Sequence, residues 1–262
     1  MTQIIGLVAT CPRIEALLTT SIPSIADQSR LPDALVIVAD HQSLPTDARQ
    51  AIRALMPATK IHFLENARAS GAAGTWNTGL AFIQQAWPQS YVAILDDDDR
   101  WDTDHLALCM STAESEAWPD VVISGLRICL DGREIPRRPL QTIAVDDFLI
   151  GNPGWQGSNT FATAAKLVAA GGFRESLVSC HDRDLAIRML DLPETRISFT
   201  GQNTATWNLN TYPNALSQPG HEKTNALRRF LALHGHRMSI EIRQQFMSRC
   251  FELFSLTADE LQ

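Results

Sequence analysis

The chain has 262 residues, of which 45% are apolar and 19% charged, and its formal net charge is −7 at pH 7. This composition is typical of a folded globular protein with one large domain, and it excludes an intrinsically disordered chain. Nucleic-acid affinity depends largely on Lys and Arg, so no long nucleic acid is expected as a partner of this acidic chain.

Local sequence excludes two further classes of protein. No apolar run approaches the roughly 20 residues of a membrane span. The first residues, MTQIIGLVATCPR, lack both a basic leader and a small-residue cleavage site. The five cysteines are scattered, without the Cys-x-x-Cys pair of a zinc knuckle or a redox dithiol. We therefore expect a cytoplasmic protein with reduced thiols.

The first half of the sequence alternates strand and helix patterns. Short β-rich runs, typical of buried strands, lie at 4–9, 34–39, 60–64 and 91–95. Helical spacing lies between them, at 14–25, 46–55 and 75–86. Pro23 is expected to lie in the first helix or to kink it. The alternation predicts a mostly parallel sheet with helices on both faces.

The second half has a mixed pattern. Asp131-Gly132 predicts a tight hairpin between strands at 121–130 and 133–135. The elements expected after it are a polar stretch at 151–159, a short strand, a helix, Gly171-Gly172, a helix at about 182–190, a strand near 196–200, a loop at 203–220 and two helices around His234-Gly235. The predicted fold class is α/β, a single doubly wound sheet that is mixed in its second half, with a C-terminal helical tail.

Four consecutive aspartates, at 96–99, follow the strand at 91–95. In an open α/β sheet, ligands bind at this end of the strands. Neighbouring carboxylates repel one another, and a hard divalent cation relieves that repulsion. A solvated acidic turn or a helix N-cap is the alternative. The buried strand before the aspartates favours the metal site.

The segment YVAILDDDDRWDTDHL resembles the Asp-x-Asp segment of the family 2 glycosyltransferases, which have the GT-A fold. The resemblance implies that Asp96 and Asp98 hold Mn²⁺ or Mg²⁺ on the diphosphate of a nucleotide sugar. Asp97, which is also expected to contact the donor, and Asp99 flank this pair. A dication there neutralises the charge that grows on the leaving nucleoside diphosphate.

Two earlier segments resemble the same family. VATCPRIEALLTTSIPSIADQS is similar to its first strand and turn, which implies donor contacts at Thr10 and Arg13. VIVAD is similar to its second strand, whose last residue, here Asp40, accepts the uracil N3 proton in UDP-using members. His41-Gln42-Ser43 replaces the usual Asp-Gly-Ser after it. A simple turn residue is the alternative for Asp40.

ENARASGAAGTWNTGL resembles the glycine-rich loop and helix start of the family. The resemblance implies donor contacts at Arg68, Gly71 and Asn77. Glycine lets the backbone approach a ligand, and a helix N-terminus favours a diphosphate. A helix cap without a ligand is the alternative.

GGFRESLVSCHDRDLAIRM resembles the segment that carries the catalytic base of the family. Matching residue by residue assigns the base to Asp182, with His181 where Glu is usual, and Asp184 and Arg188 take the later Asp and Arg positions. An inverting transfer requires one carboxylate to remove the acceptor proton as the acceptor oxygen attacks the anomeric carbon. The alternative is that Asp182 only caps its helix.

Weaker predictions concern the acceptor pocket. Trp101, Trp155, Asn159 and His181 are expected to line it, although a Trp is more often a core residue. His221 is a candidate for contact with the diphosphate or the metal, with a surface position as the alternative. Trp207 and the loop 208–220 are candidates for a lid over the donor.

The resemblance covers residues 4–207, and it implies a GT-A domain over 1–224, with a nucleotide-binding half at 1–102 and an acceptor-binding half at 103–224. The helical tail, 225–262, resembles nothing that we recognise. Its apolar residues suit packing on the body or on a second subunit, so a homodimer through these helices is possible, and an amphipathic membrane-surface role is less favoured. These residues are Leu227, Phe230, Leu231 and Leu233.

The resemblance therefore implies a metal-dependent, inverting glycosyltransferase of the hexosyltransferase type with a UDP-sugar as the favoured donor. We expect the acceptor to be a soluble glycan, a protein or a small molecule. Two alternatives stay open. One is a sugar-phosphate nucleotidyltransferase, whose Gly-x-Gly-x-Arg motif is replaced here by Ala-Thr-Cys-Pro-Arg at 9–13. The other is a non-catalytic nucleotide-sugar-binding protein, for which His181 is the best support.

Overall fold

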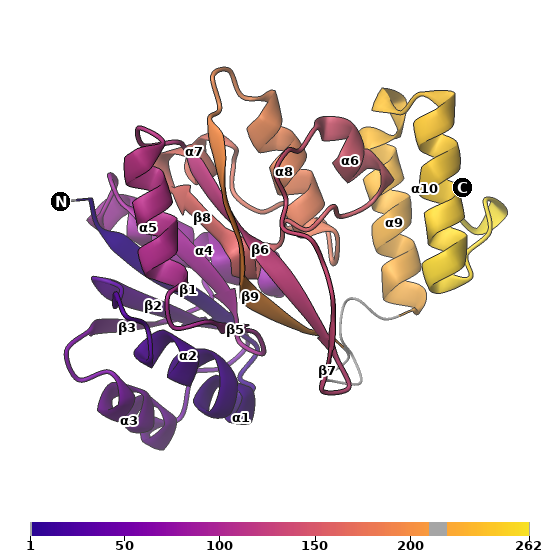
Figure 1. Ribbon diagram of the computed structural model, residues 1–262. Helices are drawn as coiled ribbons and strands as arrows, with labels where there is room; N and C mark the ends of the chain where they lie inside the picture. The colour runs from indigo at the N-terminus through magenta and orange to yellow at the C-terminus, as the bar shows by residue number, and fades with distance from the viewer. Residues whose placement is uncertain (1, 210–218, 262) are drawn as a thin grey trace.

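The computed structural model describes residues 2–209 and 219–261, in which helices cover both faces of one large sheet (Figure 1). The strands are β1 (Ile4–Thr10), β2 (Ala34–Ala39), β3 (Lys60–Glu65), β4 (Tyr91–Asp96), β5 (Arg100–Trp101), β6 (Val121–Leu130), β7 (Arg133–Ile135), β8 (Thr160–Thr163) and β9 (Ile197–Leu209). The α-helices are α1 (Ile14–Ala16), α2 (Ile22–Ala26), α3 (Thr46–Leu55), α4 (Ala72–Ala86), α5 (His105–Ser115), α6 (Val145–Ile150), α7 (Ala164–Ala169), α8 (His181–Asp191), α9 (His221–His234) and α10 (Ile240–Phe254). A π-helical turn, η1 (Leu17–Ser21), and the 3-10 turns η2 (Gly157–Asn159), η3 (Gly235–Arg237) and η4 (Asp259–Leu261) complete the list.

The parallel half of the sheet confirms the α/β prediction. Its strand order is β3-β2-β1-β4, and all three pairings are parallel. Neighbouring residues of β1 belong to different cores, since Ile5 and Leu7 pack on one face of the sheet and Ile4 and Val8 on the other. Both faces are therefore buried, which explains the continuous apolar runs of these strands.

The other half of the sheet is mixed, as predicted. β8 pairs antiparallel with both β4 and β6, and β9 pairs parallel with β6. The hairpin β6–β7 turns at Asp131 (φ 50°) and Gly132 (φ 74°), the left-handed pair that a tight hairpin turn requires. This half places η2 beside the end of β4, where the acidic residues lie.

The predicted loop at 203–220 was wrong over its first part. β9 continues to Leu209 along β6, and residues 210–218 lie outside the described residues. The run TATWNL contains Thr and Asn, which suggested a loop. Thr204 is nevertheless buried. Its hydroxyl has a hydrogen-bond partner inside the protein, His105 Nδ1 at 2.8 Å, so its burial leaves no polar group unpaired. Trp207 belongs to this strand. Most of the loop 208–220, the other part of the candidate lid, lies outside the described residues.

The predicted helix at 14–25 is interrupted by η1. The Ile22 N–H bonds to Leu17 O, five residues back, before α2 begins. Pro23 lies in the first turn of α2, where its missing N–H costs little. The proline therefore marks the irregularity that the sequence suggested.

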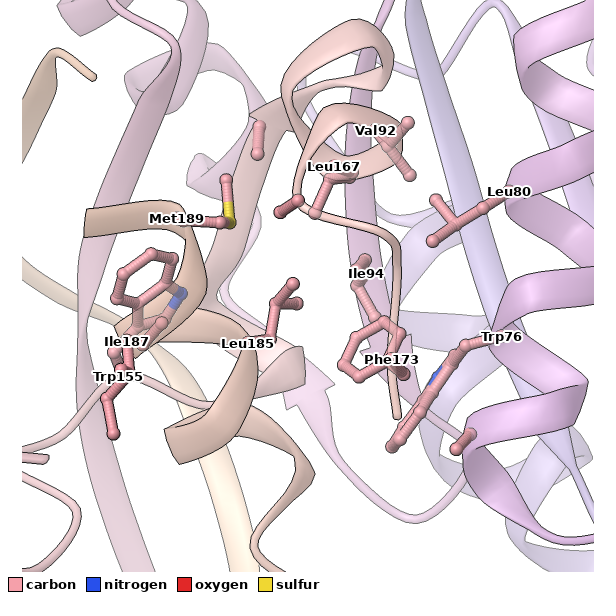
Figure 2. Close-up of a cluster of buried hydrophobic side chains, with 14 of the residues drawn as sticks. Trp76, Leu80, Val92, Ile94, Trp155, Leu167, Phe173, Leu185, Ile187 and Met189 are labelled. Atoms are coloured by element: carbon pink, nitrogen blue, oxygen red, sulfur yellow. The ribbon is translucent and has the colours of Figure 1, made fainter. Parts of the chain in front are cut away.

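Two hydrophobic cores lie on opposite faces of the sheet. The first joins α4, α7 and α8 to the strands, and its centre is shown in Figure 2. There Trp76 of α4 faces Phe173, with ring centroids 4.5 Å apart. The second core lies under η1, α2, α3 and α5. The helices α5 and α6 were not predicted.

The C-terminal tail packs on the body of the protein. α9 begins at His221, four residues before the predicted start of the tail, and the two predicted helices are confirmed. Leu227, Phe230 and Leu231 are buried in the same core as the α8 residues, and Phe246 of α10 joins them. These side chains are therefore occupied within the chain. Among the described residues, no helix is long and apolar enough to cross a membrane.

Candidate active site

The site lies where the parallel strands end. β1 and β4 run side by side in register, with Ala9 opposite Asp96, so the residues after both strands meet at one edge of the sheet. Asp40 follows the neighbouring strand β2 at the same edge. The topology thus brings together side chains that lie up to about 90 residues apart in the sequence.

Asp97 is held from β1 and the turn after it. Its carboxylate accepts hydrogen bonds from Thr10 Oγ1 at 2.5 Å and from Arg13 Nε at 3.1 Å, and a second Arg13 nitrogen also pairs with it. The side chain is 1% exposed. Burial raises the pKa of Asp97 to about 6, although the charge and hydrogen bonds of Arg13 oppose that rise. Thr10, Arg13 and Asp97, all predicted donor contacts, therefore contact one another.

Asp99 ties the acidic turn to two other elements. Its carboxylate accepts from Ser158 Oγ at 2.5 Å and from the Asn208 N–H at 2.9 Å. Burial and the charge of Asp98 raise the pKa of Asp99 to about 8. Asp99 is thus an anchor between β4, η2 and β9.

Asp98 is more exposed than Asp97 and Asp99. Its Oδ2 accepts from Arg13 Nη1 at 2.8 Å, and its main-chain oxygen accepts from Asn208 Nδ2 at 2.7 Å. A cavity of about 450 Å³, lined also by Thr19 and Thr20, opens beside it. The cavity adjoins the acidic turn but includes neither Asp96 nor Asp182.

Asp96 differs from its three neighbours because its carboxylate accepts no hydrogen bond from any residue within 2–209 or 219–261. It is half-buried at the end of β4. Burial raises the pKa of Asp96 well above its usual value, and the neighbouring carboxylates, Asp99 foremost and Asp182 among them, act in the same direction. A cation beside Asp96 would relieve this repulsion.

The carboxylates of the acidic turn fit a divalent cation that takes most of its ligands from the substrate and from water. No cluster of three or more His, Cys, Asp or Glu side chains able to hold a metal lies in the described ranges. Asp96 and Asp98 offer carboxylate oxygens, the ligand type of Mg²⁺ and Mn²⁺. Such ions commonly bind through one or two carboxylates together with substrate phosphates and water. The predicted pair is therefore compatible with a metal that binds with the donor.

Asp182 lies in the first turn of α8, close to the acidic turn. Burial raises the pKa of Asp182 to about 6, while the backbone of Gly157 and the charge of Lys223 act to lower it. A Cβ at Gly157 would lie 3.4 Å from Asp96 Oδ1. Gly157 therefore lies near both the predicted metal ligand and the predicted base.

Asp40 binds the glycine-rich loop. Its carboxylate accepts from Asn66 Nδ2 and the Gly71 N–H, each at 2.7 Å, and from Ser70 Oγ at 3.1 Å. Burial acts to raise the pKa of Asp40, but these hydrogen bonds outweigh it and the pKa is lowered. Gly71, at φ 112°, has a backbone conformation that favours glycine. Asp40 therefore fixes the loop in which Gly71 lies.

The other two predicted loop residues contact Glu175, which the sequence reasoning did not single out. Arg68 Nη1 lies 3.1 Å from Glu175 Oε1, and Asn77 Nδ2 donates to the same oxygen at 2.9 Å. Asn77 also donates to Phe173 O and accepts from the Phe173 N–H. Asn77 therefore clamps α4 to the turn before α8. The Gly-Gly-Phe-x-Glu pattern at 171–175 was the available signal for Glu175.

The four predicted acceptor residues are buried, and their polar groups have partners inside the protein. Trp101 Nε1 donates to Ser158 O, Trp155 Nε1 to Thr160 Oγ1, and Asn159 Nδ2 to two main-chain oxygens. His181 Nε2 lies 2.7 Å from Leu177 O, and burial lowers the pKa of His181 to about 4. Their contact with an acceptor stays a prediction. In this structure their polar groups bind other parts of the protein and hold the segments around the site together.

Asp184, two residues after Asp182 on α8, has a contrasting environment. Its carboxylate contacts Arg174 Nε at 3.1 Å, Arg188 Nε at 2.8 Å and His234 Nε2 at 2.9 Å. Burial acts to raise the pKa of Asp184, but the hydrogen bond from His234 and the charge of Arg188 outweigh it and lower the pKa to about 2. We call this group, Asp184 with Arg174, Arg188 and His234, the Asp184 hub. It joins α8 to α9.

Three further site residues were missed, namely Ser158, Asn208 and Lys223. Ser158 lies in the polar stretch that the sequence marked, and Asn208 falls in the wrongly predicted loop. Lys223 has no local signal, because only the packing of α9 brings it to Asp182. His221 is exposed and lies 3.2 Å from Asn225 Nδ2 on the same helix.

The sheet and its acidic edge define an α/β protein whose predicted ligand site lies at the carboxyl ends of its strands. A sequence profile described as glycosyl transferase family 2 matches residues 7–169. The chain therefore belongs to glycosyl transferase family 2, and it is a glycosyltransferase with the GT-A fold. The match ends before Asp182 and the tail. No curated protein sequence matches the chain.

Solved structures share the fold at low sequence identity. The chain is similar to residues 1–349 of S. aureus TarS in complex with UDP-GlcNAc, with a TM-score of 0.69, 17% identity, and coverage of 97% of this chain and 74% of that one. It is also similar to the mannosyltransferase PcManGT from Pyrobaculum calidifontis in complex with GDP-Man and Mn²⁺. There the TM-score is 0.57 with 16% identity, and the coverage is 90% of this chain and 65% of that one.

Proposed function

We propose that the protein transfers a sugar, with inversion at the anomeric carbon, from a nucleotide-diphosphate sugar to an acceptor hydroxyl in a metal-dependent reaction. The observation that carries this proposal is the environment of Asp96. Its carboxylate accepts no hydrogen bond from the described residues, and the charges of its three neighbouring aspartates and of Asp182 act on it.

In this proposal, Asp96 and Asp98 hold Mn²⁺ or Mg²⁺, which neutralises the diphosphate of the donor. Arg13 and Thr10 keep Asp97 in place, and Arg13 also orients Asp98. Asp97 thereby supports the turn on which the predicted metal ligands lie. Arg68, Gly71 and Asn77 shape the loop on the donor side, with Asp40 as its anchor.

Asp182 is proposed as the base. A carboxylate with a pKa of about 6 is largely ionised at neutral pH and still takes up a proton more readily than an ordinary Asp. It accepts the hydroxyl proton of the acceptor while the acceptor oxygen attacks the anomeric carbon from the face opposite the leaving nucleoside diphosphate. The products are the glycoside, the nucleoside diphosphate and a protonated Asp182.

A UDP-sugar is the favoured donor. The position of Asp40 and the UDP-GlcNAc in the TarS structure support this choice, whereas PcManGT holds GDP-Man. Thermal-shift titration with UDP-sugars and GDP-sugars, with and without Mn²⁺, tests donor and metal together. We expect the largest stabilisation from a UDP-sugar with Mn²⁺. Equal stabilisation by UDP without metal contradicts the roles of Asp96 and Asp98.

We further propose residues 1–224 as the GT-A unit and 225–262 as its tail. The tail shares the first hydrophobic core, so it is expected to fold with the unit and not alone. Leu227, Phe230 and Leu231 are buried within the chain. A homodimer through α9 and α10 would therefore have to form through other residues of these helices. Membership of the family disfavours the nucleotidyltransferase alternative.

A further inference from the structure

Four basic side chains lie along the boundary between the body and the helices α9 and α10. They are Arg137, Arg183, Lys223 and Arg249. None of them pairs with a carboxylate in the part of the chain that the structure describes. The segment 210–218, NTYPNALSQ, contains no acidic residue either. Lys223 faces the carboxylate of Asp182, so the unbalanced charge of this group belongs to its three arginines.

Two of these side chains hold the loop 151–154 from its two ends. Arg137 Nη2 donates to Pro153 O, and a Cβ at Gly154 would lie 3.2 Å from the Arg137 guanidinium. Arg249 of α10 packs so closely on Gly151 that any side chain there would overlap its guanidinium. Arg249 is exposed and Arg137 half-buried, so both can reach a ligand.

The other two side chains lie deeper and contact only uncharged partners. Arg183 donates to Phe148 O at 2.8 Å and to Leu149 O at 3.0 Å, the carbonyls near the end of α6, and its guanidinium lies 4.0 Å from the ring of Phe230. Lys223 Nζ donates to Ser179 Oγ at 2.7 Å. These contacts satisfy donors but do not neutralise the charge of Arg183. Lys223, in contrast, also faces the carboxylate of Asp182.

The cations also act on one another. Burial and then the charge of Arg249 lower the pKa of Arg137. Burial lowers the pKa of Lys223, and the charge of Arg183 acts in the same direction. Like charges gathered without a counter-charge are unfavourable, and an anion placed among them lowers that cost.

The geometry points to an anion site, which we call the basic seam, formed by Arg137 and Arg249 beside the buried Arg183, that binds a phosphate or carboxylate group of the acceptor. Arginine is suited to these planar or tetrahedral oxyanions because its guanidinium offers several donors in a fixed fork. The loop that the two arginines hold continues to Gly157, whose backbone acts to lower the pKa of Asp182 and so lies near it. An anion on the seam therefore lies on the side of Asp182 that belongs to the acceptor half. This inference rests on the proposed function, since it names the class of acceptor.

Binding of inorganic phosphate tests the seam without any transfer reaction. Its dissociation constant is measured by thermal-shift titration at an ionic strength held constant with NaCl, for the wild type, Arg137→Gln, Arg249→Gln and the control Arg243→Gln. Arg243 is an exposed arginine on the same helix as Arg249. We expect each seam variant to bind phosphate about tenfold more weakly, because a charge-assisted hydrogen bond is lost, and the control to bind as the wild type does. Absence of phosphate binding, or equal weakening in all three variants, overturns the inference.

A second measurement distinguishes the two sources of the anion. Glucose 6-phosphate, glucuronate and glucose are titrated in the same way. Tighter binding of either anion than of glucose, lost in Arg249→Gln, supports the seam and identifies phosphate or carboxylate as the preferred group. Equal binding of all three overturns it.

The seam and the proposed function fail separately. Asp182→Asn is expected to lose transfer and to keep phosphate binding, since the carboxylate of Asp182 faces Lys223 and not the arginines of the seam. Loss of phosphate binding in the arginine variants with an active Asp182→Asn enzyme refutes the base and leaves the seam. An inactive Asp182→Asn enzyme with unchanged phosphate binding in the arginine variants refutes the seam and leaves the base.

Discussion

The acidic edge and the Asp184 hub both gather charged groups, but only in the hub is every carboxylate paired with a cation. The acidic edge consists of Asp182 and the four consecutive aspartates 96–99, of which Asp97 and Asp98 pair with Arg13. Asp184 contacts two arginines and a histidine, and its pKa is low. Asp96 contacts no described donor, and its pKa is high. A balanced buried charge holds elements together, whereas an unbalanced one indicates a place where a ligand completes the structure.

The largest effect is expected at the acidic edge, when the proposed base is removed. Asp182→Asn is expected to lower kcat by roughly 10²–10⁴-fold, the usual contribution of general base catalysis, while donor affinity stays unchanged. Steady-state kinetics and donor titration check this. The control is Asp191→Asn on the same helix, whose carboxylate pairs with Arg237 at the surface and which should transfer sugar at the wild-type rate. Wild-type turnover by Asp182→Asn would falsify the assignment.

The second change tests the region of the Asp184 hub, where α8 packs against the helices of the tail. Phe230 is fully buried between Arg183 and Phe246, so Phe230→Ala is expected to lower the free energy of unfolding by roughly 3–5 kcal/mol. Phe251 of α10 is 61% exposed, and Phe251→Ala is expected to change that free energy by less than about 0.5 kcal/mol. Urea unfolding measures both. Equal effects of the two variants contradict the view that the tail belongs to the core.

The third change tests the unpaired carboxylate. Asp96→Asn is expected to weaken Mn²⁺-dependent donor binding by roughly 100-fold, because the metal loses a charged ligand, without lowering stability. Removal of the repulsion at Asp96 is expected to raise the thermal midpoint of the metal-free protein. Asp104→Asn, at an exposed aspartate just beyond the acidic edge, is the control for both measurements. Unaltered metal dependence of donor binding in Asp96→Asn argues against a metal at this position.

The smallest expected effect is the pH dependence of stability from the Asp184 hub. The pKa of Asp184 is lowered from the usual 3.8 to about 2 in the folded protein, so its contribution is present above pH 3.8 and is lost as the pH falls towards 2. The contribution is about 2 kcal/mol. Urea unfolding at pH 5 and pH 2.5, for the wild type and Asp184→Asn, measures it. The same loss of stability in both proteins shows that other carboxylates are responsible.

Much of the fold followed from local pattern. The strands at 4–9, 34–39, 60–64 and 91–95 were predicted to within a residue of their observed ends, because strands buried on both faces require continuous apolar runs. The hairpin at Asp131-Gly132 followed from turn chemistry. The extension of β9 did not, since its Thr and Asn residues are buried through partners on β6 and α5 that no local window contains.

The sequence by itself determined the parallel sheet, the four aspartates at its edge and the segments that resemble family 2 glycosyltransferases. Only the tertiary structure decided which aspartate is paired and which is not, because Thr10 and Arg13 reach Asp97 from more than 80 residues away and Ser158 reaches Asp99 from the other half of the chain. It also decided that Gly157 lies near both Asp96 and Asp182, and that the tail places Lys223 beside Asp182. The physical reason is the same in each case. Periodicity and turn residues are read within a few positions, whereas the balance of a buried charge depends on neighbours brought together by packing.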